Sequence, residues 1–235
     1  MKTFKIVMSA LAVMAGVLVV SPAANAQENG NRDENGKVVR GAYETNKFGD
    51  NWFIGAGAGV NSWLGNGASP KAGVAVDAFV GKWITPTVGV RMGWKGLKDG
   101  ASAKDGYTIA DEKFTYNSAH VDLLWNLSNL FSGYKETRTW NISVYPTFAY
   151  MNAAKNKEFG AGIGMLNNFR LGNRVGLYLD LSALTTKADF AGISPRPKTL
   201  AGVLPSATFG LTVNLGKTGF KRHSSVVPAI VPVPF

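Results

Sequence analysis

The feature that most constrains this chain is an alternation of apolar residues with polar residues or glycine, which starts at Trp52. A period of two is the pattern of a β-strand whose two faces meet different surroundings. The pattern recurs between clusters of turn residues in eight runs, at about 52–63, 73–84, 87–96, 114–127, 139–152, 158–170, 174–186 and 199–215. Their even number and their lengths are typical of the strands of a membrane barrel.

The two faces of these runs differ in charge. The parity that holds the apolar side chains carries no charged residue in any run, whereas the other parity holds glycines and polar groups. A soluble β-sandwich also alternates, so alternation alone leaves both architectures open. The signal peptide, the link lengths and the aromatic positions favour the membrane. We therefore expect an all-β protein, an eight-stranded antiparallel transmembrane up-and-down β-barrel.

The first 26 residues have the features of a secretory signal peptide. Lys2 and Lys5 precede the apolar stretch 6–20, and the small-residue site Ala24-Asn25-Ala26 follows it. No later stretch reaches the ~18 unbroken apolar residues of a membrane helix. Because only helices and closed barrels satisfy their backbone groups in lipid, we expect a barrel in the bacterial outer membrane.

The rest of the chain divides by composition. We expect a polar periplasmic arm at 27–50, the barrel at 51–216 and a proline-rich periplasmic tail at 217–235. With 46% hydrophobic residues, 17% charged residues and no cysteine, the chain is neither a disordered chain nor a disulfide scaffold. Its two histidines are far apart, so we expect no metal and no cofactor. The formal charge of +10 is spread along the chain, so we expect no nucleic-acid partner.

The links between the runs predict which end faces outward. Short links at 85–87 and 171–173 suit the periplasmic side, and the polar stretches 64–72, 97–113 and 187–198 suit extracellular loops. Two links depart from this rule, because residues 128–138 form a long inner turn and 153–157 a short outer one. Pro146 and Pro205 lie inside runs, and we expect each to require a bulge.

The candidate site lies on the polar face of the runs, which we expect to line the lumen and call the lumen parity. Eight strands enclose a space only just wide enough for side chains, where an unpaired charge is very costly. Both signs of charge occur there, which predicts an ion-pair network that plugs the lumen, made by Asp77, Arg91, Lys95, His120, Asp122 and Asp180. A narrow porin for small solutes is the alternative that the residues leave open.

Aromatic residues near the run ends predict interfacial girdles. Trp52, Trp125 and Trp140 lie near the periplasmic ends of their runs, and Trp94 and Tyr150 near the outer ends. Trp83 also lies near an inner end, but on the other parity, where the pattern breaks. The expected surroundings of such a girdle are outer-membrane lipids and lipopolysaccharide.

Ser118 and His120 raise a third possibility, because their spacing places a nucleophile and a base on one face of a strand. The corresponding function is a lipid-modifying barrel enzyme. By parity both side chains face the lumen, whereas such an enzyme needs its groups at the rim or in lipid. We therefore favour a structural role for His120, expect no enzymatic activity and assign no catalytic residue.

Three sequence blocks carry a resemblance to a known family. They are Phe48-Gly49-Asp50-Asn51-Trp52-Phe53-Ile54, Gly81-Lys82-Trp83-Ile84-Thr85-Pro86 and Leu124-Trp125-Asn126-Leu127-Ser128-Asn129-Leu130. Over roughly residues 48–220 the chain resembles the outer-membrane protein A-like barrels of Bacteroidetes. The resemblance implies an eight-stranded outer-membrane barrel with a role in envelope integrity.

The same resemblance implies partners. The barrel-assembly machinery would act during insertion, with Phe220 or Phe235 as the aromatic end signal. In that family a periplasmic peptidoglycan-binding domain commonly follows the barrel. Only fifteen residues follow Phe220 in this chain, so we expect no peptidoglycan contact.

Overall fold

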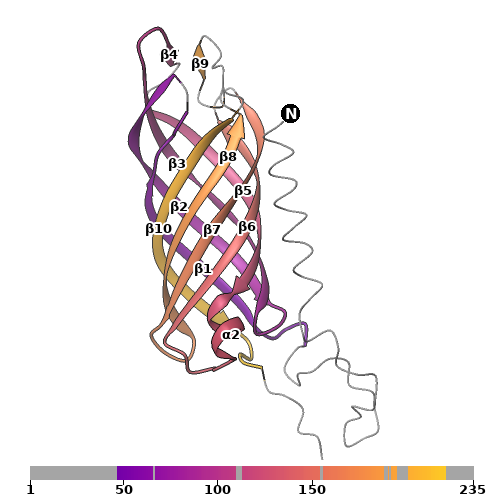
Figure 1. Cartoon of the computed structure of the whole chain (residues 1–235). Helices are drawn as coiled ribbons and strands as arrows, with labels where there is room; N and C mark the ends of the chain where they lie inside the picture. The colour runs from indigo at the N-terminus through magenta and orange to yellow at the C-terminus, as the bar shows by residue number, and fades with distance from the viewer. Residues whose placement is uncertain are drawn as a thin grey trace, which may run out of the picture.

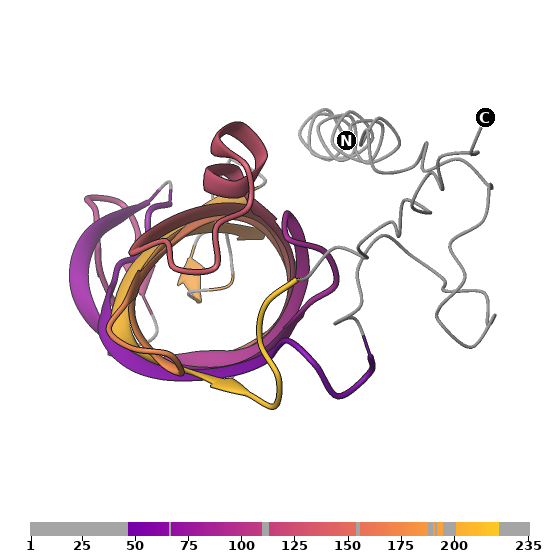
Figure 2. The ribbon, with the colours of Figure 1, turned by 90° about the horizontal axis from the view of Figure 1, so that it is seen from below.

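The computed structural model describes residues 47–65, 67–109, 113–153, 156–187, 190, 192–194 and 201–220. These residues form a cylinder of tilted strands with one short helix outside its wall (Figures 1 and 2). The expected signal peptide, most of the arm and residues 221–235 of the tail lie outside the described residues. In the described part of the chain, no helix is long and apolar enough to cross a membrane.

Eight long antiparallel strands close the barrel in the order β1-β10-β8-β7-β6-β5-β3-β2, which confirms the expected fold class. The bounds of these strands are β1 Trp52–Asn61, β2 Ala68–Trp83, β3 Val88–Ala103, β5 Lys113–Asn126, β6 Trp140–Ala153, β7 Lys157–Arg170, β8 Val175–Lys187 and β10 Ala201–Leu215. The first and last strands pair from Trp52 opposite Leu215 to Asn61 opposite Ser206. No long strand is therefore left with an unpaired edge.

Three shorter elements lie at the two ends. We call the end where β1 begins and β10 finishes the base, and it carries helix α2 (Leu127–Ser132) (Figure 1). We call the opposite end the rim, and it carries a two-stranded sheet of β4 (Thr108–Ile109) and β9 (Ile193–Ser194). Asn126 caps α2, because its side chain accepts a hydrogen bond from the backbone N–H of Asn129.

The alternation in sequence becomes an alternation in exposure. In β1 the odd-numbered residues turn toward the lumen and are buried or half-buried, and the even-numbered residues from Ile54 to Val60 are exposed. The largest exposed apolar side chains of the other strands also point outward, among them Met92, Val121, Ile163, Phe209 and Leu211. The barrel is thus apolar outside and contains its polar groups, as the sequence pattern predicted.

Side chains fill the lumen because large residues lie opposite glycines. A Cβ placed on Gly55 would meet the ring of Phe79 at 2.3 Å, and one placed on Gly164 would meet the ring of Tyr145 at 2.2 Å. Two apolar clusters result. The rim cluster contains Trp63, Tyr116, Met151, Leu184, Phe190, Ile193 and Leu204. The basal cluster contains Phe53, Phe79, Leu124, Tyr145, Leu166 and Tyr178, with Trp83 packed against it.

The structure corrects several expected links. Residues 97–103, expected in a loop, continue β3, and β2 begins at Ala68 rather than at 73. A register shift between Lys71 and Val74 breaks the alternation there, which hid this part of the hairpin from the sequence pattern. The expected long inner turn 128–138 begins with α2.

The expected bulges at the two prolines are wrong. The register of β6 is unchanged on both sides of Pro146, and the β5–β6 ladder simply lacks pairs between Asp122↔Thr147 and Trp125↔Val144. The ladder between β1 and β10 runs from Leu215 back to Ser206 and stops there. The next residue, Pro205, has no backbone N–H to donate to β1. In both places a closed barrel accepts proline by leaving out ladder bonds rather than by inserting a residue.

Candidate functional site

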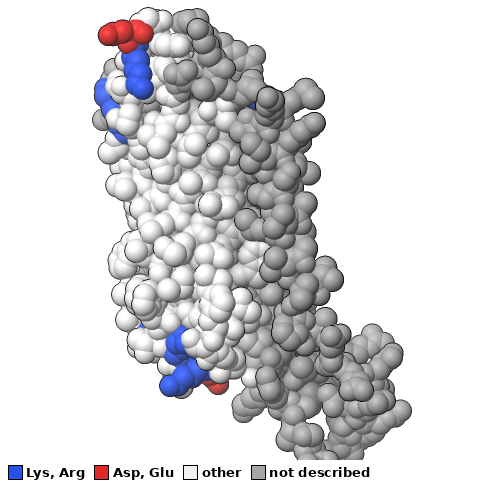
Figure 3. Space-filling model, in the orientation of Figure 1, with Lys and Arg blue, Asp and Glu red and all other residues white. Residues whose placement is uncertain are grey.

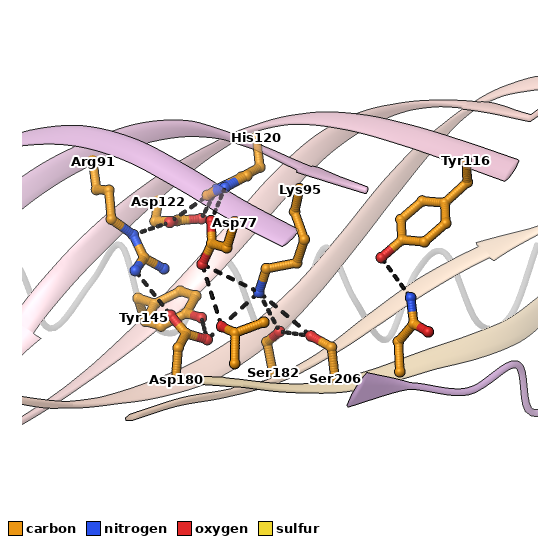
Figure 4. A network of polar contacts seen from close by, with 12 residues as sticks. Asp77, Arg91, Lys95, Tyr116, His120, Asp122, Tyr145, Asp180, Ser182 and Ser206 are labelled. Atoms are coloured by element: carbon orange, nitrogen blue, oxygen red, sulfur yellow. Dashed lines mark hydrogen bonds and ion pairs between the residues drawn. The ribbon is translucent and has the colours of Figure 1, made fainter. Parts of the chain in front are cut away.

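The six charged residues expected in the lumen lie together at mid-height in the barrel (Figure 4). We call them the charged layer: Asp77 of β2, Arg91 and Lys95 of β3, His120 and Asp122 of β5, and Asp180 of β8. Register explains two of the contacts, because Asp77 is directly opposite Lys95 and Arg91 directly opposite Asp122. Asp180 approaches from across the lumen.

Arg91 is the centre of the charged layer. Its Nε donates to Asp122 Oδ2 at 2.6 Å, and one terminal nitrogen donates to Asp180 Oδ2 at 2.8 Å. Only 1% of the residue is exposed. The guanidinium carbon lies 4.7 Å from the ring centroid of Phe79 and 4.6 Å from that of Tyr145. Rings and carboxylates together compensate for the removal of this charge from water.

Lys95 and Tyr145 connect the remaining carboxylate oxygens. The Tyr145 hydroxyl donates to Asp180 Oδ1 at 2.6 Å. Lys95 Nζ lies 3.7 Å from Asp180 Oδ1 and 3.9 Å from Asp77 Oδ2. Lys95 also donates to the hydroxyls of Ser182 and Ser206, at 3.3 and 3.4 Å.

Only one of the two ring nitrogens of His120 has a hydrogen-bond partner among the described residues. Nδ1 lies 3.1 Å from both oxygens of Asp122. Nε2 lies 3.8 Å from Asp77 Oδ1, and neither of these two atoms has a hydrogen-bond partner among the described residues. A cavity of about 30 Å³ beside His120 has room for about one water molecule. Three carboxylates face Arg91 and Lys95, so a protonated His120 makes the charged layer neutral.

The arrangement does not assemble a nucleophile. Ser118 and His120 are both buried in the lumen, but none of the hydrogen bonds among the described residues joins them. In the described part of the chain there is also no group of three or more histidine, cysteine or acidic residues placed to hold a metal ion. The chemistry that the geometry supports is mutual charge neutralisation inside a filled lumen.

The aromatic residues occupy the outer face at different heights. Trp52 and Trp140 begin β1 and β6, and Trp125 is the penultimate residue of β5, so these three lie near the base. Tyr150 lies three residues from the rim end of β6. The expected position of Trp94 near an outer strand end is wrong, because β3 continues to Ala103 and leaves Trp94 near its middle.

Sequence reasoning missed several neighbours of these residues. Phe169 stacks on Trp140 with ring centroids 5.9 Å apart, and Phe159 packs on Tyr150 at 5.3 Å. In the lumen it left Tyr145, Ser182 and Ser206 out of the network. The alternation does place all three on the face that lines the lumen. It does not show which residues meet across the lumen, so their contacts could not be predicted.

Comparison with known proteins finds a similar sequence and several solved structures with partial similarity. No family model matches the chain. Outer membrane protein 40 of Porphyromonas gingivalis is 29% identical over 238 residues, which are 94% of this chain and 60% of that protein. The chain therefore spans less than two thirds of the length of this relative.

The solved structures share low sequence identity with the chain. Neisserial surface protein A has a TM-score of 0.47 and 8% identity, with 70% of this chain and 97% of that chain covered. The N-terminal barrel domain of OprF from Pseudomonas aeruginosa has a TM-score of 0.42 and 10% identity, over 71% and 99%. Ail of Yersinia pestis has a TM-score of 0.40 and 11% identity, over 69% and 99%. By its own strand order and its outward apolar face, the chain is an eight-stranded barrel of the outer-membrane type.

Proposed function

We propose that the protein is an integral β-barrel of the bacterial outer membrane with a structural role in the envelope, and that its lumen is plugged. The outer face supports membrane insertion. On the face shown in Figure 3, the visible Lys, Arg, Asp and Glu residues gather at the two ends and leave an uncharged band between them. Large apolar side chains such as Met92, 58% exposed, and Phe209, 56% exposed, point away from the barrel. Contact with water would be unfavourable for so many of them, whereas contact with lipid would not. The 29% identical relative is itself named an outer-membrane protein.

The observation that carries the plug is the position of Arg91. Its side chain joins Asp122 of β5 to Asp180 of β8 and so crosses the lumen from wall to wall. The rim cluster fills the lumen on one side of this bridge and the basal cluster on the other. An ion crossing the barrel would have to displace a desolvated ion-pair network between two apolar plugs, which costs far more than passage through a wet pore.

The links support a topology with the base in the periplasm. Strands β2 and β3 are joined at the base by a four-residue link, and β7 and β8 by another of the same length. Two rim connections are long and carry β4 and β9, whereas the long basal connection 127–139 and the short rim connection 154–156 depart from this pattern. Periplasmic turns are short and extracellular loops long in outer-membrane barrels. Outer-membrane lipids and lipopolysaccharide would surround the barrel, and the barrel-assembly machinery would insert it.

Conductance across a planar bilayer tests this function. We expect no steady conductance from the reconstituted protein, and a heat-dependent shift in gel migration that shows a folded barrel. Steady conductance from the unaltered protein would replace the plugged barrel with the narrow porin. Conductance that appears only in Arg91→Ala would place the block at the charged layer.

The topology has a separate test. Protease added to intact cells should cut the rim connections, for example near Lys104 and Asp105, which are exposed. Cleavage that requires a permeabilised outer membrane would invert the orientation.

A further inference from the structure

The base of the barrel contains a second polar space, distinct from the charged layer. It is a cavity of about 170 Å³, which we call the basal vestibule. The basal cluster closes it toward mid-height, where Phe53, Trp83 and Leu166 contribute to its lining. Amide side chains are its most frequent lining group: Asn51, Asn126, Asn129, Asn141, Asn168, Asn173 and Asn214. The basal vestibule is therefore a blind pocket, because the lumen beyond it is filled.

Two buried polar atoms of the lining have no hydrogen-bond partner among the described residues. They are Asn129 Oδ1 and Arg138 Nε. The amide of Asn129 is held in place, since its Nδ2 donates to the carbonyl of Pro86 at 2.7 Å and only 9% of the residue is exposed. Arg138 is fixed through one terminal nitrogen, which donates to the carbonyl of Gly133 at 2.6 Å. One oriented acceptor and one oriented donor thus remain for another molecule.

The start of the tail gives the basal vestibule a fixed wall. The backbone N–H of Gly219 donates to Asn51 Oδ1 at 2.9 Å, and that of Phe220 donates to the Tyr134 hydroxyl at 3.1 Å. The rings of Phe220 and Tyr134 meet edge to face with centroids 5.7 Å apart. A pocket whose wall is already held in place loses less conformational entropy when a ligand binds.

The chemistry of the lining indicates the kind of ligand. A hydroxyl group both accepts and donates, so a ligand with several hydroxyls can accept from Arg138 Nε and donate to Asn129 Oδ1. The wall also provides the indole of Trp83. Lys135, Arg138 and Arg170 outnumber Glu136 among the charged lining residues, which favours a negative group on the ligand. Arg170 already donates to Gly172, Glu136 and Asn173, so Arg138 is the guanidinium left for recognition.

We propose that the basal vestibule binds one pyranose ring of an acidic saccharide, with Arg138 and Asn129 on its hydroxyl and carboxylate groups and Trp83 beside the ring. The cavity is smaller than the ~300 Å³ at which sites for drug-sized ligands begin, which suits a single ring. A peptide would also suit amide side chains, but an extended chain needs a groove with two open ends. The site shares the basal cluster with the proposed plug but does not use the charged layer, and its compartment depends on the proposed topology.

Binding is tested with the folded full-length barrel in detergent or nanodiscs. The probes are D-glucuronate, D-glucose and the dipeptide Ala-Ala, and the readout is the NMR signal of the Trp83 indole, assigned with Trp83→Phe. We expect a saturable shift with glucuronate and a weaker one with glucose. No saturable shift with either sugar would overturn the proposal, and saturation by the dipeptide alone would assign the site to peptides.

Two arginines at the base form a matched pair of variants. Arg138→Gln should weaken glucuronate binding at least tenfold. Arg174→Gln should leave binding unchanged, because Arg174 is exposed and does not line the cavity. Equal effects of the two variants would mean that the sugar responds only to positive charge at the base, which would overturn the site. Heat-dependent gel migration shows whether each variant is folded, so a folded, non-conducting barrel that binds no sugar rejects this inference and leaves the proposed function intact.

Discussion

The charged layer and the basal vestibule are both polar regions inside one barrel, and they differ in how completely their arginines are paired. At mid-height, Arg91 contacts two carboxylates and two aromatic rings while 1% exposed. At the base, Arg138 is half-buried and leaves its Nε without a partner among the described residues. A charged side chain that is far from water needs opposite charges within the protein, whereas a half-buried charged side chain near the mouth stays partly hydrated. Depth therefore separates residues that hold the barrel together from residues that are free to bind.

The strongest test of this comparison removes the central charge. Arg91→Ala leaves Asp122 and Asp180 buried without their guanidinium, which should cost about 3–5 kcal/mol of unfolding free energy. The double variant Arg91→Ala/Asp122→Ala should be less destabilised than Arg91→Ala alone, because it removes one of the stranded carboxylates. Urea unfolding in lipid vesicles measures both. Strictly additive losses would mean that the charges do not depend on one another.

The outer face should show the same dependence on depth. Leu179 lies near the middle of β8, beside Asp180 of the charged layer, and Leu215 ends β10 at the base. Leu179→Arg should cost about 2–4 kcal/mol and Leu215→Arg about 0–1 kcal/mol, because a cation at the bilayer midplane has no access to water. The same unfolding measurement compares the two variants. Similar costs at the two positions would contradict a bilayer centred on the barrel.

A smaller change separates hydrogen bonding from ring packing in the charged layer. Tyr145→Phe keeps the ring over Arg91 and removes the 2.6 Å hydrogen bond to Asp180. A hydrogen bond to a charged group contributes about 1.5–3 kcal/mol, so the unfolding free energy should fall by that amount. Tyr150→Phe on the outer face is the control, with an expected change within about 0.5 kcal/mol. If the two variants lose equally little, the Tyr145 hydroxyl is not needed for the charged layer.

The smallest effect is expected at the base. Arg138→Gln should change the unfolding free energy by no more than about 0.5 kcal/mol, since the side chain is half-buried and its hydrogen bond lies near solvent. The measurement is again urea unfolding, read against Arg174→Gln. A loss comparable with that of Arg91→Ala would make the basal vestibule part of the stabilising structure and would end the distinction between the two regions.

Much of the fold could be predicted from the sequence because the barrel repeats one local rule. The alternation from Trp52 to Val60 marks a strand by itself, and seven further runs do the same. The rule fails where the chain departs from it. Leu97 has a positive φ of 135°, and the nearby register shift in β2 ends the regular alternation before the strands end. Trp94 was misplaced for that reason.

The sites were predictable to different degrees. The members of the charged layer could be predicted because a charged residue that faces the lumen of a narrow barrel can be compensated only by other lumen residues. The basal vestibule could not, because its lining comes from strand ends, the 133–138 segment and residues 218–220, which have no common period. Trp83 shows the difference. Its parity did not fit an outer girdle, and the structure explains why, since it packs against the basal cluster inside the lumen.

The separation of Arg91 and Asp180 along the chain has a consequence for folding kinetics. The two partners are 89 positions apart in the sequence, and they meet across the lumen, not along a ladder. The contact can form only after the sheet has curled, so its stabilisation is absent from early folding intermediates. Interactions that form after the transition state slow unfolding and leave the folding rate almost unchanged. The charged layer should therefore lower the unfolding rate of the closed barrel without raising its folding rate.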